Sequence, residues 1–75
     1  MVALMGRRMM RIVRTKYSEH GPVQIQDHGT AFLVSYPALE PENAGYQREK
    51  IFDKTSAGAW NKAQHFAASK LRGEG

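Results

Sequence analysis

Apolar residues recur at helical spacing in one long stretch of this chain, between about residue 56 and residue 72. They share one stripe of a predicted helix, which consists of Ala59, Trp60, Ala63, Phe66, Ala67 and Leu71. Polar side chains occupy the opposite side of the same helix, namely Lys62, His65, Ser69 and Arg72. Thr55 or Ser56 can cap its first turn, and Gly73 is typical of a helix end. The pattern therefore predicts an amphipathic helix that covers one face of a core.

The stretches before this helix are rich in β-branched and aromatic residues, which predicts strands at residues 9–17, 23–26, 30–36 and 46–52. In the second strand, alternation predicts that Val23 and Ile25 point inward and the two glutamines outward. Gly29 can take the left-handed position of a short hairpin turn between the second and third strands. The third strand is apolar on both sides, which is typical of a central strand. Alternation in the first strand is imperfect, so the pattern leaves open which of its faces is buried.

These elements predict an α+β fold, in which a small antiparallel sheet of three to four strands carries one C-terminal amphipathic helix on one face. We expect a single domain over residues 9–73, preceded by a flexible N-terminal leader at residues 1–8. Residues 37–45 contain two prolines and a glycine, so we expect an irregular loop there. Glu40 and Glu42 make this loop the most acidic part of the chain.

Charge and composition indicate which kinds of partner the protein can bind. The 75 residues include 11 Lys and Arg against 7 Asp and Glu, a formal net charge of +4. This surplus attracts polyanions, although solubility alone also accounts for it. No stretch has the roughly 20 consecutive apolar residues of a membrane-spanning helix. We therefore expect no membrane partner. Cysteine is absent, which excludes disulfides and thiolate metal sites and fits a cytoplasmic protein.

The residues that could carry chemistry do not form a catalytic or metal-binding motif. Serines and three histidines are present, but no nucleophile elbow accompanies them. His20 and His28 are separated from His65 by about half of the chain, and no pair has the spacing of a zinc motif. The 7 glycines are scattered, so no phosphate-binding loop is formed. We therefore expect a non-enzymatic protein with no cofactor and no bound metal.

Basic residues of the first and last strands suggest a binding surface. With two glutamines, they predict a polar sheet face opposite the helix, made of Arg14, Lys16, Gln24, Gln26, Arg48 and Lys50. Lys and Arg neutralise DNA phosphates, and Arg and Gln can contact base edges. The alternative is an ordinary solvated sheet face. Alternation would also send Phe52 outward with Arg48 and Lys50, so the hypothesis requires a bulge or a turn at Phe52.

The order of motifs in the second half of the chain is similar to that of a known family. Residues 32–36, Phe-Leu-Val-Ser-Tyr, form an aromatic strand, and residues 48–52, Arg-Glu-Lys-Ile-Phe, form a basic stretch. Residues 52–55, Phe-Asp-Lys-Thr, lead into the Ala-Gly-Ala-Trp of residues 57–60. Over roughly residues 23–72, the chain resembles the arm-type DNA-binding domain of phage and transposon tyrosine integrases. The resemblance implies a three-stranded sheet plus helix that binds DNA.

The chain departs from that family in two ways. The loop at residues 37–45 is acidic where the family often has a basic turn. No catalytic domain follows the helix, so the resemblance implies either a free-standing DNA-binding module or a truncated piece of a longer protein, in both cases without recombinase activity of its own.

Two other functions stay open. The first is a small phage-type accessory or inhibitor protein, similar to the anti-CRISPR proteins, that binds a protein or nucleoprotein target. Met5, Met9 and Met10 would suit an adaptable apolar contact with such a target. The second is a homo-oligomer, because an apolar central strand and an exposed sheet edge can pair with another copy.

Overall fold

The computed structural model describes residues 10–73, which form a four-stranded antiparallel sheet and one α-helix. The elements are β1 (Arg11–Ser18), β2 (Gly21–Asp27), β3 (Ala31–Pro37), the 3-10 turn η2 (Pro41–Asn43), β4 (Gln47–Asp53) and α1 (Ala59–Leu71). Consecutive strands are neighbours, so β1 and β4 are the edges of the sheet. The predicted α+β fold is confirmed, with four strands. The expected leader at residues 1–8 lies outside the described residues.

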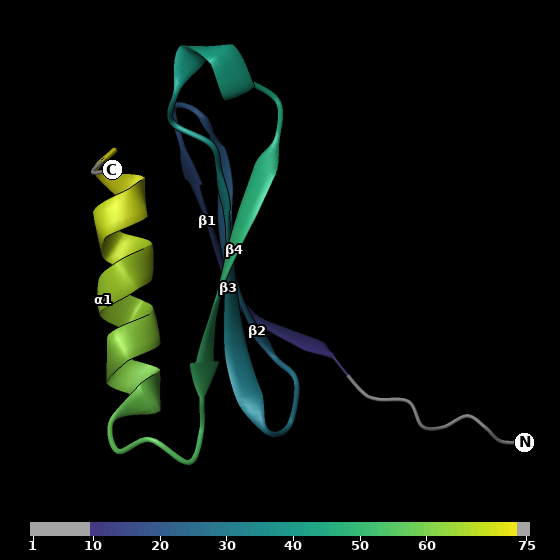
Figure 1. Ribbon diagram of the computed structural model, residues 1–75, viewed down its shortest axis with the longest axis vertical. Coiled ribbons are helices and arrows are strands. Elements are labelled where there is room, and N and C mark those ends of the chain that lie inside the picture. The colour runs from purple at the N-terminus through teal and green to yellow at the C-terminus, as the bar shows by residue number, and fades with distance from the viewer. Residues whose placement is uncertain (1–9, 74–75) are drawn as a thin grey trace, which may run out of the picture.

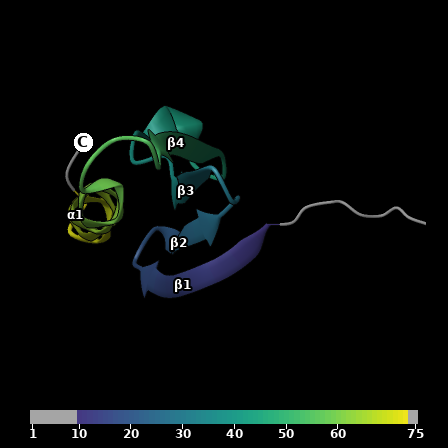
Figure 2. The same ribbon diagram turned by 90° about the horizontal axis from the view of Figure 1, so that it is seen from below.

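The two sides of the sheet have different neighbours. α1 lies along one side, packed mainly on the central strands β2 and β3 (Figure 1). Figure 2 shows no described element on the other side. We call these two surfaces the helix side and the open side. An antiparallel sheet can keep one face in water when its strands alternate between apolar and polar residues.

The core between the sheet and α1 is small. It consists of Val23, Ile25, Val34, Ala63 and Ala67, and the large aromatic side chains pack around these residues. Among the described residues, Ile25 and Val34 are the only large side chains that are fully buried, at 1% and 0% exposure. Both the inward position of Val23 and Ile25 and the apolar stripe of the helix are therefore confirmed.

Aromatic pairs join the helix to the strands around this core. The ring centroids of Phe32 and Trp60 are 5.1 Å apart. Phe66 lies edge-on to Tyr36 at 5.2 Å and to Phe52 at 5.6 Å. Tilted and edge-to-face pairs at these distances each add about 0.5–1.5 kcal/mol beyond the apolar area that they bury. Trp60 and Phe66 are thus structural residues of the interface between helix and sheet.

The helix begins at Ala59, so the start predicted at Thr55 or Ser56 is wrong. The reason is the carboxylate of Asp53, which accepts hydrogen bonds from both the backbone N–H and the hydroxyl of Thr55 at 2.8 Å. The backbone bond first, and the hydroxyl bond second, hold the pKa of Asp53 below its ordinary value. Gly58 then caps the helix with a φ of 74°, which L side chains rarely adopt.

The other turns follow the sequence more closely. Gly73 ends α1 with a φ of 82°, as predicted. Gly29 has a φ of 89° in the hairpin turn, and its N–H donates to Oδ1 of Asp27 at 2.9 Å. The expectation of a wholly irregular loop at residues 37–45 is wrong in part, because η2 forms one turn there with Pro41 at its start.

A β-bulge at Val13 decides which residues of β1 face the helix. Ile12 lies opposite Gln26 and Arg14 lies opposite Ile25, so Val13 is an extra residue between them. Residues directly opposite each other in a sheet share a face. Arg14 therefore lies on the helix side with Ile25, which settles the choice that the sequence pattern left open.

Candidate nucleic-acid interface

Every Lys and Arg of the four strands lies on the helix side of the sheet: Arg11, Arg14, Lys16, Arg48 and Lys50. Their cross-strand partners establish this, because Lys16 lies opposite Val23 and Lys50 lies opposite Val34. Both valines belong to the core beneath α1. The cations flank the helix on the two edge strands, β1 on one flank and β4 on the other.

The two glutamines of the predicted surface lie on the open side. Gln24 is opposite Thr15 and Ser35, and Gln26 is opposite Leu33. The prediction of one surface opposite the helix, shared by the six candidate residues, is therefore wrong. The structure brings the four candidate cations to one side of the sheet and places the glutamines on the other.

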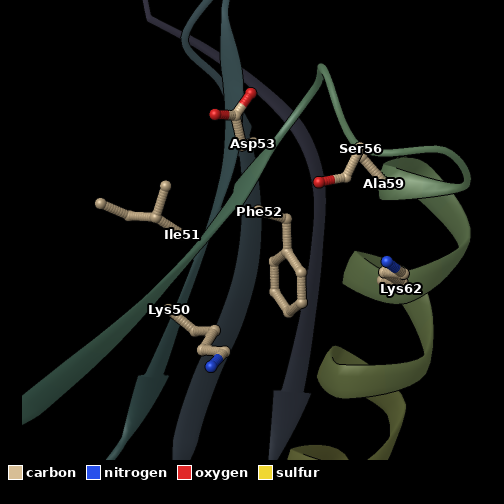
Figure 3. A pocket seen from close by; sticks show the side chains of 7 residues that line it. All are labelled: Lys50, Ile51, Phe52, Asp53, Ser56, Ala59 and Lys62. Carbon is tan, nitrogen blue, oxygen red and sulfur yellow. The ribbon is translucent and has the colours of Figure 1, made fainter.

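Phe52 explains why the basic residues of β4 face the helix. The register between β3 and β4 runs without a shift, so the bulge at Phe52 that the hypothesis required is not formed. The Phe52 ring packs on Phe66, and alternation then carries Lys50 and Arg48 to the same side. In Figure 3, the Phe52 side chain points from β4 towards α1, whereas Ile51 points the other way.

A groove of about 350 Å³ lies between β4 and the first turns of α1 (Figure 3). Its lining residues are Lys50, Ile51, Phe52, Asp53, Ser56, Ala59 and Lys62. The Lys50 ammonium lies 6.0 Å from the centroid of the Phe52 ring. Among the described residues, no carboxylate pairs with Lys50 or Lys62. Two ammonium groups without a carboxylate partner, together with the Ser56 hydroxyl, suit an anionic group in this groove.

The flank of the helix beside β1 is also basic but has less room. The Arg14 guanidinium lies 5.9 Å from the centroid of the Trp60 ring. Lys16 makes no ion pair within residues 10–73. The gap that both residues line beside α1 has a volume of about 60 Å³. Arg14 and Lys16 therefore add positive potential on this flank rather than a second groove.

Carboxylates neutralise the other cations near the sheet. Nη2 of Arg48 lies 3.1 Å from Oε1 of Glu40 in the loop after β3. The hydrogen bond from Arg48 is the main reason that the pKa of Glu40 is lowered. Asp27 pairs with Nζ of Lys54 at 2.6 Å and with Nη2 of Arg11 at 3.5 Å. Of the four predicted cations, Arg48 is thus the least available to a ligand.

Two residues of the groove, Lys62 and Ser56, do not follow from the sequence pattern. The helical pattern places Lys62 on the solvent side of the helix, and Ser56 is typical of a helix cap. The signal that identifies Lys62 is its spacing, because it lies one turn after Ala59 on the flank that faces β4. That signal can be used only once the packing of Phe52 on Phe66 shows which side chains of β4 point towards α1.

Comparison of the chain with protein-family models, with curated proteins and with solved structures finds no match. Among residues 10–73, no group of three His, Cys, Asp or Glu side chains is placed to hold a metal ion. No helix in the same part of the chain is long and apolar enough to cross a membrane. The resemblance to the arm-type domains stays a prediction.

Proposed function

We propose that this protein is a non-enzymatic nucleic-acid-binding module that holds DNA phosphates in the groove between β4 and α1. One observation carries the proposal: Lys50 and Lys62 line the same groove, and no carboxylate in residues 10–73 pairs with either. Each cation that neutralises a phosphate releases counterions from DNA, which makes such binding strongly dependent on salt. The formal net charge of +4 favours encounter with the same ligand.

The proposed mode of binding is driven by phosphates rather than by bases. Phosphate contacts position a protein on DNA but carry no sequence information by themselves. Gln24 and Gln26, which were the candidate base readers, lie on the open side and are not part of this interface. We therefore expect little preference among DNA sequences. A cytoplasmic location and the absence of catalytic activity belong to the same proposal.

The test is a titration of a labelled mixed-sequence duplex, followed by fluorescence anisotropy from about 50 to about 200 mM salt. The double variant Lys50→Ala/Lys62→Ala should reduce the slope of log Kd against log salt by about 1.8, since each phosphate contact contributes about 0.9. The matched control is Gln24→Ala/Gln26→Ala, which changes the open side and should leave the slope unaltered.

Two results would contradict the proposal. One is the absence of wild-type binding at about 50 mM salt, where contacts to phosphate are still strong. The other is a loss of affinity in the glutamine variant with no change in the lysine variant, which would move the interface to the open side.

A second candidate function is that of a small accessory or inhibitor protein of the phage type that binds a protein target. The observation that favours it is the exposed apolar surface of the open side, where Ile12 and Ile51 are 50% and 65% exposed. Ile12 and Ile51 lie on the two edge strands of this face, and Leu33 on β3 adds to its apolar area. Met10 is 51% exposed, whereas Met5 and Met9 lie outside the described residues.

A further inference from the structure

Tyr46, the residue directly before β4, carries an aromatic side chain that is 68% exposed. Within residues 10–73, no aromatic pair and no cation–π contact includes its ring. Tyr36 on the adjacent strand differs, because its ring packs edge-on to Phe66 and lies 4.9 Å from the Lys70 ammonium. The Tyr46 ring therefore has a face that is open to a ligand.

The backbone of Tyr46 is held by hydrogen bonds on both sides. Its N–H donates to the carbonyl of Asn43 at 3.0 Å, and its carbonyl accepts from the N–H of Ala38 at 2.9 Å. Gly45, directly before it, has a φ of 95°, which L side chains rarely adopt. The turn around η2 thus fixes the position of Tyr46 before any ligand arrives, and a preorganised group loses less entropy on binding.

The hydrogen bond from Ala38 also shows which side of the sheet Tyr46 faces. It continues the ladder between β3 and β4 by one pair, so that Ala38 lies opposite Tyr46. Alternation then places Tyr46 on the helix side with Arg48 and Lys50. At about 3.3 Å per residue, Tyr46 and Lys50 are roughly 13 Å apart along the edge strand β4. The ring and the groove therefore lie on one line along β4.

Arg48 lies between the ring and the groove on this line. Its charge is offset by Glu40, whose Oε1 is 3.1 Å from Nη2 of Arg48. The middle of the line thus adds little positive charge. One end is a phosphate site at Lys50 and Lys62, and the other end is the aromatic ring of Tyr46.

An open aromatic ring beside a phosphate site favours a single strand over a duplex. In a duplex the bases are stacked on one another, so their faces are not available to a ring on the protein surface. In a single strand the faces are accessible, and bases of any sequence can stack on an aromatic side chain. A basic groove combined with such a ring is the arrangement that binds single strands without sequence preference.

From these observations we propose that the preferred ligand is single-stranded DNA, with its phosphates at Lys50 and Lys62 and a base stacked on Tyr46. This proposal rests on the proposed function, because the phosphate site is the same groove. The two ends of the line contribute different kinds of affinity. Contacts of the lysines with phosphate weaken as salt is added, whereas stacking on Tyr46 changes little with salt.

Fluorescence anisotropy tests this with a labelled oligothymidylate of about 12 residues and with a duplex of the same length. At about 0.15 M salt, the wild type should bind the single strand at least about fivefold more tightly than the duplex. Tyr46→Ala should weaken binding of the single strand at least about fivefold and leave its salt slope unaltered. Tyr46→Phe keeps the ring and should bind as the wild type does.

The matched control is Tyr17→Ala. Tyr17 is 79% exposed, and it lies on the open side because its neighbour Lys16 faces the helix. Its removal should leave the affinity for both ligands unchanged. Circular dichroism of each variant confirms that it is folded.

Three outcomes would overturn the preference for a single strand. They are a wild type that binds the duplex at least as tightly, a Tyr46→Ala variant that binds the single strand normally, and a Tyr17→Ala variant that loses as much affinity as Tyr46→Ala. In each case, a salt slope that still falls in Lys50→Ala/Lys62→Ala leaves the proposed function intact. Failure of both ligands to bind at about 50 mM salt contradicts the proposed function and this preference together.

Discussion

On the helix side of the sheet, five cations of the strands surround a small apolar core, whereas the open side of the same strands has none. Most of the acidic residues of the strands lie on the open side, namely Glu49 and Asp53. The one on the helix side, Asp27, is paired with Arg11 and Lys54. Both sides are built from the same four strands, so strand alternation alone separates the two kinds of surface. The comparison shows that alternation can gather the cations of a small sheet on one face and leave exposed apolar side chains such as Ile12 and Ile51 on the other.

The largest expected effect is on stability, when an isoleucine is replaced by alanine on the helix side and, for comparison, on the open side. Ile25 is 1% exposed and Ile51 is 65% exposed. Ile25→Ala leaves a cavity beneath α1 and should lower the free energy of unfolding by about 2–5 kcal/mol. Ile51→Ala should cost less than about 1 kcal/mol, because it changes mainly strand propensity. Urea denaturation of a dilute sample measures both values.

Equal losses at Ile25 and Ile51 in that dilute sample would mean that the two sides do not differ as described. If Ile25→Ala is unfolded, Ile25→Val provides a graded comparison, with an expected loss of about 0.5–1.5 kcal/mol.

A smaller effect is expected from moving charge between the two sides. The variant Lys50→Ala/Lys62→Ala/Gln24→Lys/Gln26→Lys keeps the formal net charge at +4 but places two lysines on the open side. If position decides binding, the slope of log Kd against log salt should stay about 1.8 below that of the wild type. Fluorescence anisotropy over the same salt series measures it. Recovery of the wild-type slope would show that net charge alone drives association.

The smallest effect is expected from the carboxylates of the two sides. The hydrogen bond from Lys54 first, and that from the Gly29 N–H second, lower the pKa of Asp27 below its ordinary value of 3.8. A lowered pKa in the folded state means that ionised Asp27 stabilises the fold at neutral pH, and that this contribution is lost as the pH falls below 3.8 through the folded value. Asp27→Asn should therefore be less stable than the wild type at pH 7 and approach it in acid.

Thermal unfolding followed by circular dichroism at a series of pH values measures this difference. The matched control is Glu49→Gln on the open side, which removes a carboxylate that makes no ion pair within the described residues. It should leave the stability at pH 7 unchanged. A constant difference between Asp27→Asn and the wild type at every pH would show that the carboxylate acts through its shape rather than its charge.

Local signals in the sequence were sufficient for much of the fold. The apolar stripe of α1, the inward Val23 and Ile25 and the glycine of the hairpin turn each depend on residues close together in the chain. The start of the helix could not be predicted from the capping preference of Thr55 alone. The Thr55 side chain is instead engaged by Asp53, to which its hydroxyl donates, and this contact is visible only in the folded turn.

The candidate site could be predicted only in part. Its residues come from separate strands, and the pairing of these strands decides which side chains share a face. The sequence identified Arg14, Lys16, Arg48 and Lys50 as candidate ligands of phosphate, and the structure places them on one side of the sheet. The side was predicted wrongly, since the packing of Phe52 on Phe66 carries Lys50 inward with it. Lys62 enters the groove from a different element, so no pattern within one strand could reveal it.

Val13 is an unpaired residue within β1, and it reverses the alternation of side chains between the two faces at that point. Residues before and after Val13 alternate in opposite phase, and so Arg11 and Arg14, three positions apart, lie on the same side. If Val13 were paired in a regular ladder instead of bulging, strict alternation back from Arg14 would turn Ile12 towards the helix and carry Arg11 to the open side. The separation of charge between the two faces therefore depends on the bulge as well as on the composition of β1. Deletion of Val13 itself would leave Ile12 opposite Gln26 and Arg14 opposite Ile25, whereas deletion of a paired residue of β1 would exchange the sides of its neighbours.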